Sequence, residues 1–491
     1  MRQAQLESSD VVSVGVAFTS CTMLPTLSDG TPLCQLGTFA REPLAWPKLW
    51  KHHAAKHQAD RVNEIAWRRK EAFLDDFGGV IGLEWFFPKI LETLERAPHV
   101  YAATEVWLEA GDWLVWQLVG GPAAELPRST CQAGYKAMWS REAGYPSPAF
   151  FKAVHPDLAD VVRDKMPGRL LTPGQKAGRL SQSQAKRIGL SAGIPVSAAV
   201  IDAHAGVPGA GAAEPGILVM VLGTSSCHMV NATERRHVPG VAGIVEGGIL
   251  PKMFGYETGQ AAVGDAFDWL RRNVGHRDFA ILDRLAREVP PGADGVRCLD
   301  WLNGCRTPLM DGHLRGVISG LTLEHQPAHL YRALLEGSAF GLRWIVDLLR
   351  ENGVPVNQFV ATGGLPHHNP LLVEIYADVL GEAITVHPCQ HGPALGAAIL
   401  GALAASERTG FRTATAAVRA MAAAQRGVPG RESRRIRPSR RNRRVYEAAY
   451  EEYRRLAESF QFQEPVLIGK NTGRRPGAQL AKKQGFSVHG T

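Results

Sequence analysis

The sequence predicts an α/β protein with a largely parallel sheet. Short apolar runs alternate with segments of helical spacing along most of the 491 residues, and such alternation is typical of parallel strands joined by helices. Hydrophobic residues make up 45% of the chain and charged residues 21%, both ordinary values for a globular protein. A chain of this length is expected to form about two to four domains.

In the first half, the apolar run 11–16 predicts a buried strand, and residues 24–33 predict a hairpin around Ser28-Asp29-Gly30. Residues 89–120 have helical spacing, and the tryptophans at 107, 113 and 116 are expected in the core. The apolar run 195–201 predicts a strand that ends at Asp202 and opens into a glycine-rich loop.

The second half repeats the alternation. Strands are expected at 216–222, 226–231, 357–361 and 383–387, and helices at 260–272, 329–352, 369–380, 393–405 and 445–460. Asn369 suits the N-cap of its helix and Pro370 the first turn. Beyond residue 469 the chain is polar and rich in Gly, Lys and Arg, which favours disorder.

The formal net charge of +8 is concentrated near the C-terminus. Residues 431–444 carry +7 and residues 465–491 carry +5, so the rest of the chain is mildly acidic at −4. No aromatic residue interleaves the arginines of 431–444, so a solvated connector and a disordered tail are favoured over a nucleic-acid interface. No apolar run approaches the roughly 18 residues of a membrane span. Seven cysteines without a C-x-x-C pair argue against disulfides and structural zinc, and favour a cytoplasmic protein.

Three strand ends carry residues suited to phosphate chemistry. Asp202 is a lone carboxylate that could take a proton from a hydroxyl. Gly223, Thr224 and Ser225 follow an apolar strand, where their N–H groups could surround an anion. Gly363 and Gly364 let a ligand approach the backbone closely. The alternative for each is structural: an aspartate that caps a turn, a plain turn, and a tight β–α turn.

Six blocks in register resemble the FGGY carbohydrate kinases, and within that family the ribulokinases. They are FTSCTMLP at 18–25, KLWKHH at 48–53, AGYK at 133–136, DAHAG at 202–206, GYETGQ at 255–260 and DWLNG at 300–304. The resemblance extends from about residue 11 to about residue 460, and the W-K-H-H sequence is its most specific part.

The resemblance implies two actin-like, ribonuclease H-like domains around a central cleft. We expect a sugar-binding domain at 1–207, a nucleotide-binding domain at 208–462, and a disordered basic tail at 463–491. The implied reaction is ATP-dependent phosphorylation of L-ribulose or a related pentulose at its 5-hydroxyl, as in arabinose catabolism. Mg²⁺ would arrive with ATP and keep most of its waters. The partners implied are the sugar and ATP, with no nucleic acid and no membrane, and a homodimer is compatible with this reading.

The resemblance also implies a role for each block. Asp202 would be the catalytic base, and Ser20, Lys136 and Glu257 would line the sugar site together with it. Gly223, Thr224 and Ser225 would bind the phosphates, and Gly363, Gly364 and Asn369 would lie at the adenosine. A surface lysine and a structural glutamate remain the alternatives for Lys136 and Glu257. His52, His53 and His204 are expected to be structural, and no metal site formed by neighbouring residues is visible.

The sequence departs from the family pattern near its start. FGGY kinases begin with a G-x-D-x-G-[TS] hairpin, and this sequence contains no such motif. We therefore expect an N-terminally truncated chain whose first domain is incomplete. Ala17 stands where the family has the aspartate of Asp-Phe-Thr. An impaired sugar-binding remnant, a kinase for another pentulose or a pentitol, and an actin-like ATPase acting on proteins are the alternative functions.

Overall fold

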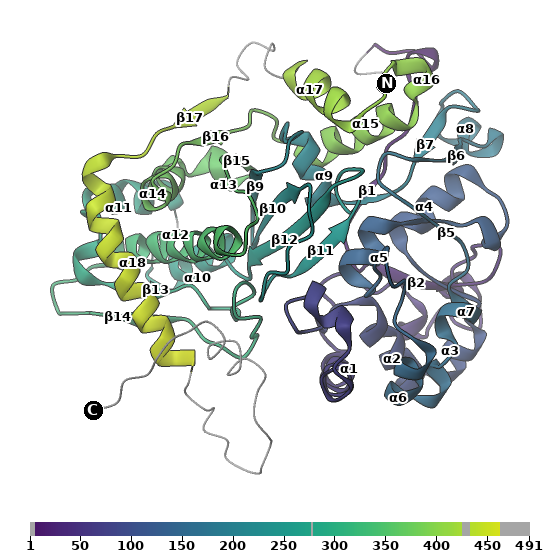
Figure 1. Ribbon diagram of the computed structural model, residues 1–491, viewed down its shortest axis with the longest axis horizontal. Helices are drawn as coiled ribbons and strands as arrows, with labels where there is room; N and C mark the ends of the chain where they lie inside the picture. The colour runs from purple at the N-terminus through teal and green to yellow at the C-terminus, as the bar shows by residue number, and fades with distance from the viewer. Residues whose placement is uncertain (1–4, 276–277, 425–432, 462–491) are drawn as a thin grey trace.

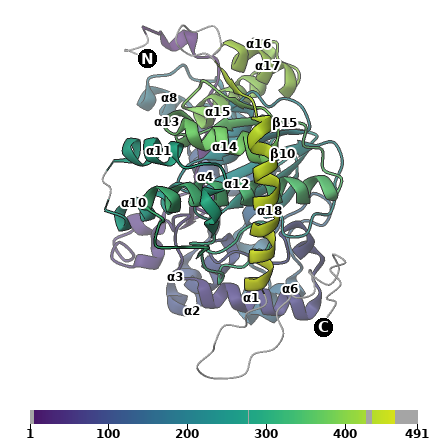
Figure 2. The same cartoon turned by 90° about the vertical axis from the view of Figure 1, so that its left-hand side faces the viewer.

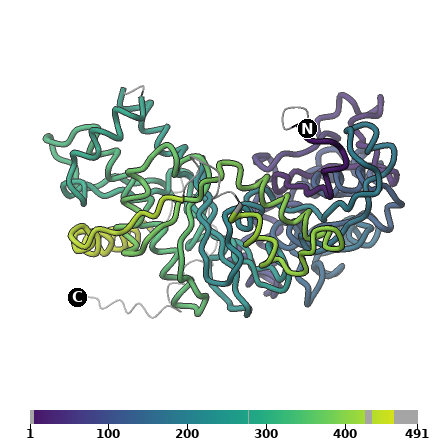
Figure 3. Tube along the Cα trace, turned by 90° about the horizontal axis from the view of Figure 1, so that it is seen from above, coloured from purple at the N-terminus to yellow at the C-terminus, as the bar shows by residue number. Residues whose placement is uncertain are grey.

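The structure is a computed structural model that describes residues 5–275, 278–424 and 433–461. The N-terminal half, purple to blue in Figure 1, lies on one side, and a mixed sheet with its helices forms the other side. Figure 3 shows the same two halves from above, with the segment around α15 reaching from the second half over the first. The predicted basic tail at 463–491 lies outside the described residues.

Seven strands form the main sheet, in the order β11-β12-β10-β9-β15-β16-β17. Their bounds are β9 Ile217–Leu222, β10 Ser226–Ala232, β11 Gly243–Glu246, β12 Phe254–Gln260, β15 Gln358–Thr362, β16 Ile384–Val386 and β17 Arg434–Ile436. Only β9–β15 and β15–β16 pair in parallel, and the other four pairs are antiparallel. The prediction of a largely parallel sheet was therefore wrong, because short turns such as 223–225 join neighbouring strands as hairpins.

Both faces of this sheet are covered. Alternate residues of β9 point to opposite sides, as a pleated strand requires. Leu218, Met220 and Leu222 pack in a core cluster with α12 (Pro327–Glu351), α14 (Pro370–Leu380) and α18 (Arg440–Gln461). Val219 packs in a second cluster with α9 (Asp202–Gly209), α15 (Gly392–Ala404) and α17 (Ala414–Ala424). Figure 2 shows α18 running along the outside of the first of these layers.

The remaining elements of the second half lie at the edges of these layers. They are α10 Gly264–Asn273, α11 Phe279–Glu288, α13 Leu365–His368, α16 Ser406–Thr409 and the antiparallel pair β13 Arg297–Leu299 and β14 Val317–Ser319. The expected helices and strands of this half are confirmed, although the sequence pattern did not predict β11, β12, β13, β14, α11 or α17. The prediction of a solvated connector at 431–444 was wrong for its described part, because Arg434–Ile436 pairs with β16 as β17 and α18 begins at Arg440.

The N-terminal half has short strands in pairs instead of one continuous sheet. The pairs are β1 (Ala17–Phe18) with β8 (Val200–Ile201), β2 (Met23–Thr26) with β3 (Val106–Glu109), β4 (Pro127–Ser129) with β5 (Arg169–Leu171), and β6 (Lys176–Arg179) with β7 (Pro195–Ser197). Its helices are α1 Lys56–Arg69, α2 Phe86–Arg96, α3 Pro98–Ala103, α4 Ala110–Val119, α5 Thr130–Lys136, α6 Pro148–Val154, α7 Val161–Lys165 and α8 Gln182–Ile188.

Three predictions for the first 120 residues need correction, and the expected strand 195–201 is divided into β7 and β8. Residues 11–16 form no strand and make one isolated bridge, between Val14 and Val196. The principal partner of β2 is the distant β3, and the expected hairpin is reduced to a turn with one bridge between Thr26 and Pro32. Because β3 pairs with β2, Val106–Glu109 is a strand within the range 89–120 that was expected to be helical. Long-range pairing overrides the local helical pattern there, while Trp107 and Trp116 are buried as predicted.

The glycine-rich stretch after Asp202 is a helix, α9, and not the expected loop. Its glycines allow close packing against α15. A Cβ on Gly209 would lie 1.9 Å from the carbonyl oxygen of Gly392, and a Cβ on Gly396 would lie 1.8 Å from that of Ala205. The small residues therefore serve a helix–helix contact, which local sequence cannot distinguish from a ligand loop.

Replacing Gly396 with alanine is expected to lower the free energy of unfolding by about 3 kcal/mol, because the neighbouring atom is rigid backbone. Thermal unfolding of the variant measures the loss. Gly37→Ala is the matched control, since no atom lies within 4 Å of a Cβ placed there. Equal midpoints for the two variants would contradict the close packing of α9 on α15.

In the part of the chain that the structure describes, no helix combines the length and the apolar composition needed to cross a bilayer.

Candidate active site

Asp202 lies at the end of a parallel strand pair. In the register of β1 and β8, Phe18 faces Ile201, so the residues that follow both strands emerge at the same edge. Ser20 comes two residues after β1, and Asp202 directly after β8 at the first position of α9. Asp202 is half-buried, and its Oδ1 accepts a hydrogen bond of 2.7 Å from the N–H of Ala203. Oδ2 has no hydrogen-bond partner among the described residues.

Lys136 and Glu257 meet across the two halves of the molecule. Lys136 is the last residue of α5, and its Nζ donates to Glu257 Oε1 and Oε2 at 2.8 and 2.9 Å. His204 of α9 brings Nε2 within 3.2 Å of Glu257 Oε2. Trp85 lies over the ammonium group, 5.4 Å from Nζ to the ring centroid. The three polar side chains are buried, and Lys136 is the most exposed of them at 8%.

Glycines of the main sheet position α5. A Cβ on Gly255 would lie 2.3 Å from the hydroxyl of Tyr135, and a Cβ on Gly243 would lie 2.5 Å from its ring. The missing side chains leave room for Tyr135, and Lys136 therefore arrives opposite Glu257. The Tyr135 ring also packs on His204, with 4.2 Å between centroids.

The electrostatics keep the Lys136–Glu257 pair ionised. Burial by itself raises the pKa of Glu257, but Lys136 and His204 outweigh it and hold that pKa well below its usual range. Burial lowers the pKa of Lys136, and the Glu257 carboxylate outweighs it, so this pKa is raised. The pKa of the Asp202 carboxyl is also raised, because its burial exceeds the opposing effects of the Ala203 N–H and His204. A raised pKa suits a group that must accept a proton.

The turn at Gly223, Thr224 and Ser225 is held by the start of α10. The N–H groups of Val263 and Gly264 donate to the carbonyls of Thr224 and Gly223, at 2.9 and 3.0 Å. The N–H of Gly223 is used inside the turn, on the carbonyl of Ser225. The N–H groups of Thr224 and Ser225 make no hydrogen bond to any described residue, and Thr224 is exposed. Two of the three predicted donors are therefore available to an anion.

Gly363 and Gly364 lie beside this turn, because β15 pairs in parallel with β9. Gly363 has φ +95°, and a Cβ there would lie 2.4 Å from the carbonyl oxygen of Leu222, so only glycine fits without strain. A Cβ on Gly364 would meet only the imidazole of His368, 4.0 Å away. Gly364 therefore borders an accessible surface next to the 223–225 turn.

Asn369 is the N-cap of α14, as predicted, and its Oδ1 accepts from the N–H of Leu372 at 2.9 Å. Its amide nitrogen donates to Asp283 and Tyr331 at 2.9 and 3.1 Å. The carboxamide is thus engaged on both sides in protein contacts. The capping role is confirmed, and the position at the adenosine stays a prediction.

The structure joins Lys136 and Glu257 with His204, two residues after Asp202 on α9, and it places Gly363 and Gly364 beside the 223–225 turn. Sequence reasoning did not foresee that Lys136 and Glu257 bond to each other, that His204 joins them, or that Trp85 covers them. The AGYK, DAHAG and GYETGQ blocks were the signal for this cluster, but no local pattern reveals which side chains meet. His52 contacts Glu92 at 2.6 Å, in keeping with a structural role. Within the described ranges, no group of three or more His, Cys, Asp or Glu side chains could hold a metal ion.

Comparison with known proteins agrees with this arrangement. Residues 218–405 match the C-terminal domain of the FGGY family of carbohydrate kinases. A ribulokinase from Shouchella clausii is 43% identical over 470 residues, 93% of this chain and 82% of that protein. A ribulokinase from Bacillus licheniformis is 40% identical over 480 residues, 95% of this chain and 85% of that protein. These matches extend over nearly the whole chain and do not support the predicted truncation.

Among solved structures, a xylulose kinase from Brucella ovis superimposes with a TM-score of 0.76, at 22% identity, over 92% of this chain and 85% of that one. At this identity the likeness supports the fold alone, which is the predicted pair of actin-like domains. The incompleteness of the first domain stays a prediction. From its 43% identity to a ribulokinase, the chain belongs to the FGGY family of carbohydrate kinases.

Proposed function

We propose that this carbohydrate kinase transfers the γ-phosphoryl group of ATP to the 5-hydroxyl of L-ribulose. The observation that carries the proposal is the Lys136–Glu257–His204 cluster, whose His204 lies two residues after Asp202 on α9, in a chain 43% identical to a ribulokinase. A sugar kinase needs a base beside polar groups that orient the hydroxyls of its substrate. We place the sugar-binding domain at 1–207, the nucleotide-binding domain at 208–462, and the site between them.

Each group of the site has a role in this reaction. Asp202 Oδ2 is the atom that takes the proton of the attacking hydroxyl, since Oδ1 is held by the N–H of Ala203. The remaining N–H of Lys136 and the free lone pairs of Glu257 orient the sugar, and Ser20 lines the wall beside Asp202. The N–H groups of Thr224 and Ser225 bind phosphate oxygens, and Gly363, Gly364 and Asn369 border the adenosine. Mg²⁺ enters with ATP as part of the substrate and neutralises its phosphates.

A coupled assay of ADP release, with Mg-ATP and a panel of pentuloses and pentitols, tests the proposal. We expect turnover with L-ribulose to exceed turnover with the other sugars. Faster turnover of another pentulose or of a pentitol would overturn the choice of substrate. Sugar binding by calorimetry without turnover would favour an impaired remnant. Ala17 suggests this alternative, because it stands where the family has an aspartate. ATP hydrolysis indifferent to every sugar would favour an ATPase acting on proteins.

A further inference from the structure

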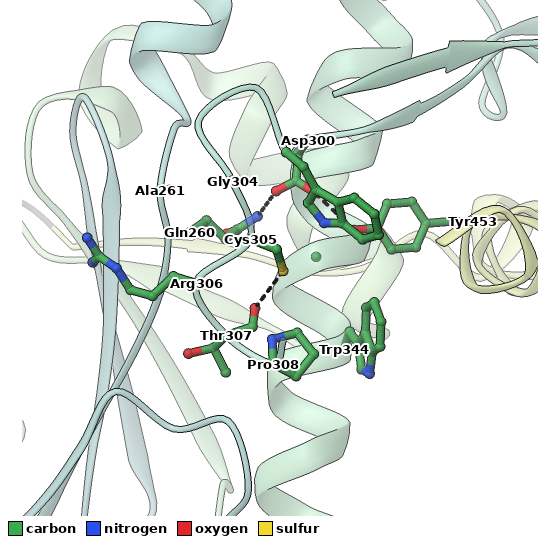
Figure 4. A pocket seen from close by; sticks show the side chains of 12 residues that line it. Gln260, Ala261, Asp300, Gly304, Cys305, Arg306, Thr307, Pro308, Trp344 and Tyr453 are labelled. Atoms are coloured by element: carbon green, nitrogen blue, oxygen red, sulfur yellow. Dashed lines mark hydrogen bonds between the residues drawn. The ribbon is translucent and has the colours of Figure 1, made fainter. Parts of the chain in front are cut away.

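A second cation lies next to the Lys136–Glu257 pair. Arg306 follows the DWLNG block on a loop that is fixed to β12, because the N–H of Thr307 donates to the carbonyl of Gly259 at 3.2 Å. The N–H of Met310 closes the loop on the carbonyl of Arg306 at 2.6 Å. Arg306 is one of the residues that line the small cavity bordered by this loop, but Figure 4 shows its side chain directed away from Asp300, Tyr453 and Trp344.

The direction of Arg306 follows from a row of residues on β12. Gly255, Glu257 and Gly259 alternate along the strand and share one face. Tyr135 fills the space over Gly255, Lys136 lies opposite Glu257, and Arg306 Nη1 would lie 3.4 Å from a Cβ on Gly259. Two residues of strand span about 6.6 Å, so the guanidinium lies one step along the row from the Glu257 carboxylate.

The guanidinium has no anionic partner among the residues that the structure describes. Its Nη1 lies 4.0 Å from the Sγ of Cys227, and this is the one hydrogen-bond contact of the side chain among the described residues. Glu257 and Glu84 both favour its charge, yet neither carboxylate lies within 4.0 Å in the described ranges. Arginine has five N–H donors, and a partly buried guanidinium that leaves most of them unused is suited to an anionic ligand.

The position of Cys227 shows where Arg306 lies relative to the 223–225 turn and to the Lys136–Glu257 pair. Cys227 comes two residues after Ser225, on the hairpin whose turn carries the free N–H groups. The charges of Arg306, Glu257, Lys136 and Asp202 all act on its thiol, whose pKa is raised chiefly by burial. Arg306 is therefore close both to the base and sugar cluster and to the phosphate turn. Lys136 is paired with Glu257. Of these two cations, Arg306 is therefore the one that has no carboxylate partner among the described residues.

We propose that Arg306 is a further catalytic residue, whose guanidinium donates to the oxygens of the phosphoryl group as it passes from ATP to the sugar. This inference rests on the proposed function. In the transfer, the bond between the γ-phosphorus and the oxygen bridging to the β-phosphorus breaks, and a bond forms from that phosphorus to the sugar oxygen. The hydroxyl proton goes to Asp202, and ADP leaves with the bridging oxygen. Arg306 exchanges no proton and stabilises the charge on the moving group.

Arg306→Met and Arg306→Lys test the proposal, with Arg315→Met as the matched control. Arg315 is exposed on the same loop region, and among the described residues its side chain donates only to carbonyls of its own segment. We expect Arg306→Met to lower kcat about 100-fold, with the KM for L-ribulose within about threefold of the parent value. Arg306→Lys should recover only part of the rate, because an ammonium lacks the planar fork. The control should match the parent.

Binding separates this inference from the proposed function. By calorimetry, Arg306→Met should bind β,γ-imido-ATP about tenfold more weakly and ADP unchanged, since only the analogue carries the γ-phosphoryl group. The same selective loss in a protein that phosphorylates no pentulose would refute the proposed function and keep Arg306 at the γ-phosphate. An unchanged ratio of the two affinities overturns the inference. A raised KM for ribulose at unchanged kcat also overturns it, because Arg306 would then bind the sugar.

Discussion

Replacing Asp202 with asparagine is expected to lower kcat for sugar phosphorylation by about 10³-fold, because general base catalysis contributes about 10²–10⁴. The amide keeps the size of the side chain and its contact with the Ala203 N–H, but it cannot take the hydroxyl proton. ADP release at saturating Mg-ATP and L-ribulose measures the loss. Asp157→Asn, an exposed aspartate in the first turn of a 3₁₀ helix at 156–158, is the matched control and should leave the rate unchanged.

The pH dependence follows from the same carboxyl group. Asp202 must be ionised to act as the base, and its pKa is raised by burial. Activity should therefore fall as the pH drops through a value above the usual aspartate pKa of about 3.9. The profile of kcat/KM against pH should show this acid limb in the parent protein and lose it in Asp202→Asn. An acid limb of the same midpoint in both proteins would assign the titration to another group and remove Asp202 as the base.

Replacing Lys136 with methionine is expected to lower the free energy of unfolding by about 3–5 kcal/mol, since it leaves the buried Glu257 carboxylate without its partner. Denaturant unfolding measures the change. Glu257→Gln alone should also destabilise the protein, by leaving the ammonium buried and unpaired. The double variant Lys136→Met/Glu257→Gln should recover much of the loss, so that the cycle gives a large interaction energy.

An exposed pair provides the comparison for this cycle. Arg287 and Glu374 are 2.6 Å apart, and both are more than 40% exposed, so Arg287→Met should cost below about 1 kcal/mol. Ribulose should raise the unfolding temperature of the parent and of Arg287→Met, but not of the Lys136 variant. If ribulose stabilises the Lys136 variant as strongly as the parent, the buried pair is structural and Lys136 does not bind the sugar.

Much of the candidate site could be predicted because its residues follow strands. Asp202 ends β8 and the Gly223 turn ends β9, and each strand shows in the sequence as a short apolar run before a small or polar residue. Parallel pairing brings the segments that carry Ser20 and Asp202 out at the same edge, and places Gly363 beside the turn, since parallel strands end at the same edge. Asn369 was recognisable as an N-cap from its position before a proline.

The rest depended on contacts between distant segments. Lys136 and Glu257 are 121 residues apart and bond to each other, a pairing that no local pattern contains. The same holds for β3, which was read as helix because its antiparallel partner β2 lies far away in the sequence. The glycines of α9 looked like those of a ligand loop, although they accommodate α15.

The sequence by itself determined the family, the alternation of strands and helices, and the residues at the strand ends, because propensity, hydrophobic period and motif are local properties. The tertiary structure decided which of these residues touch. It placed His204 and Lys136 on Glu257, left Asp202 Oδ2 without a partner among the described residues, and put Arg306 over the neighbouring Gly259. Charge pairing and burial arise only when segments far apart in the chain pack together, and they set the protonation states on which the proposed chemistry depends.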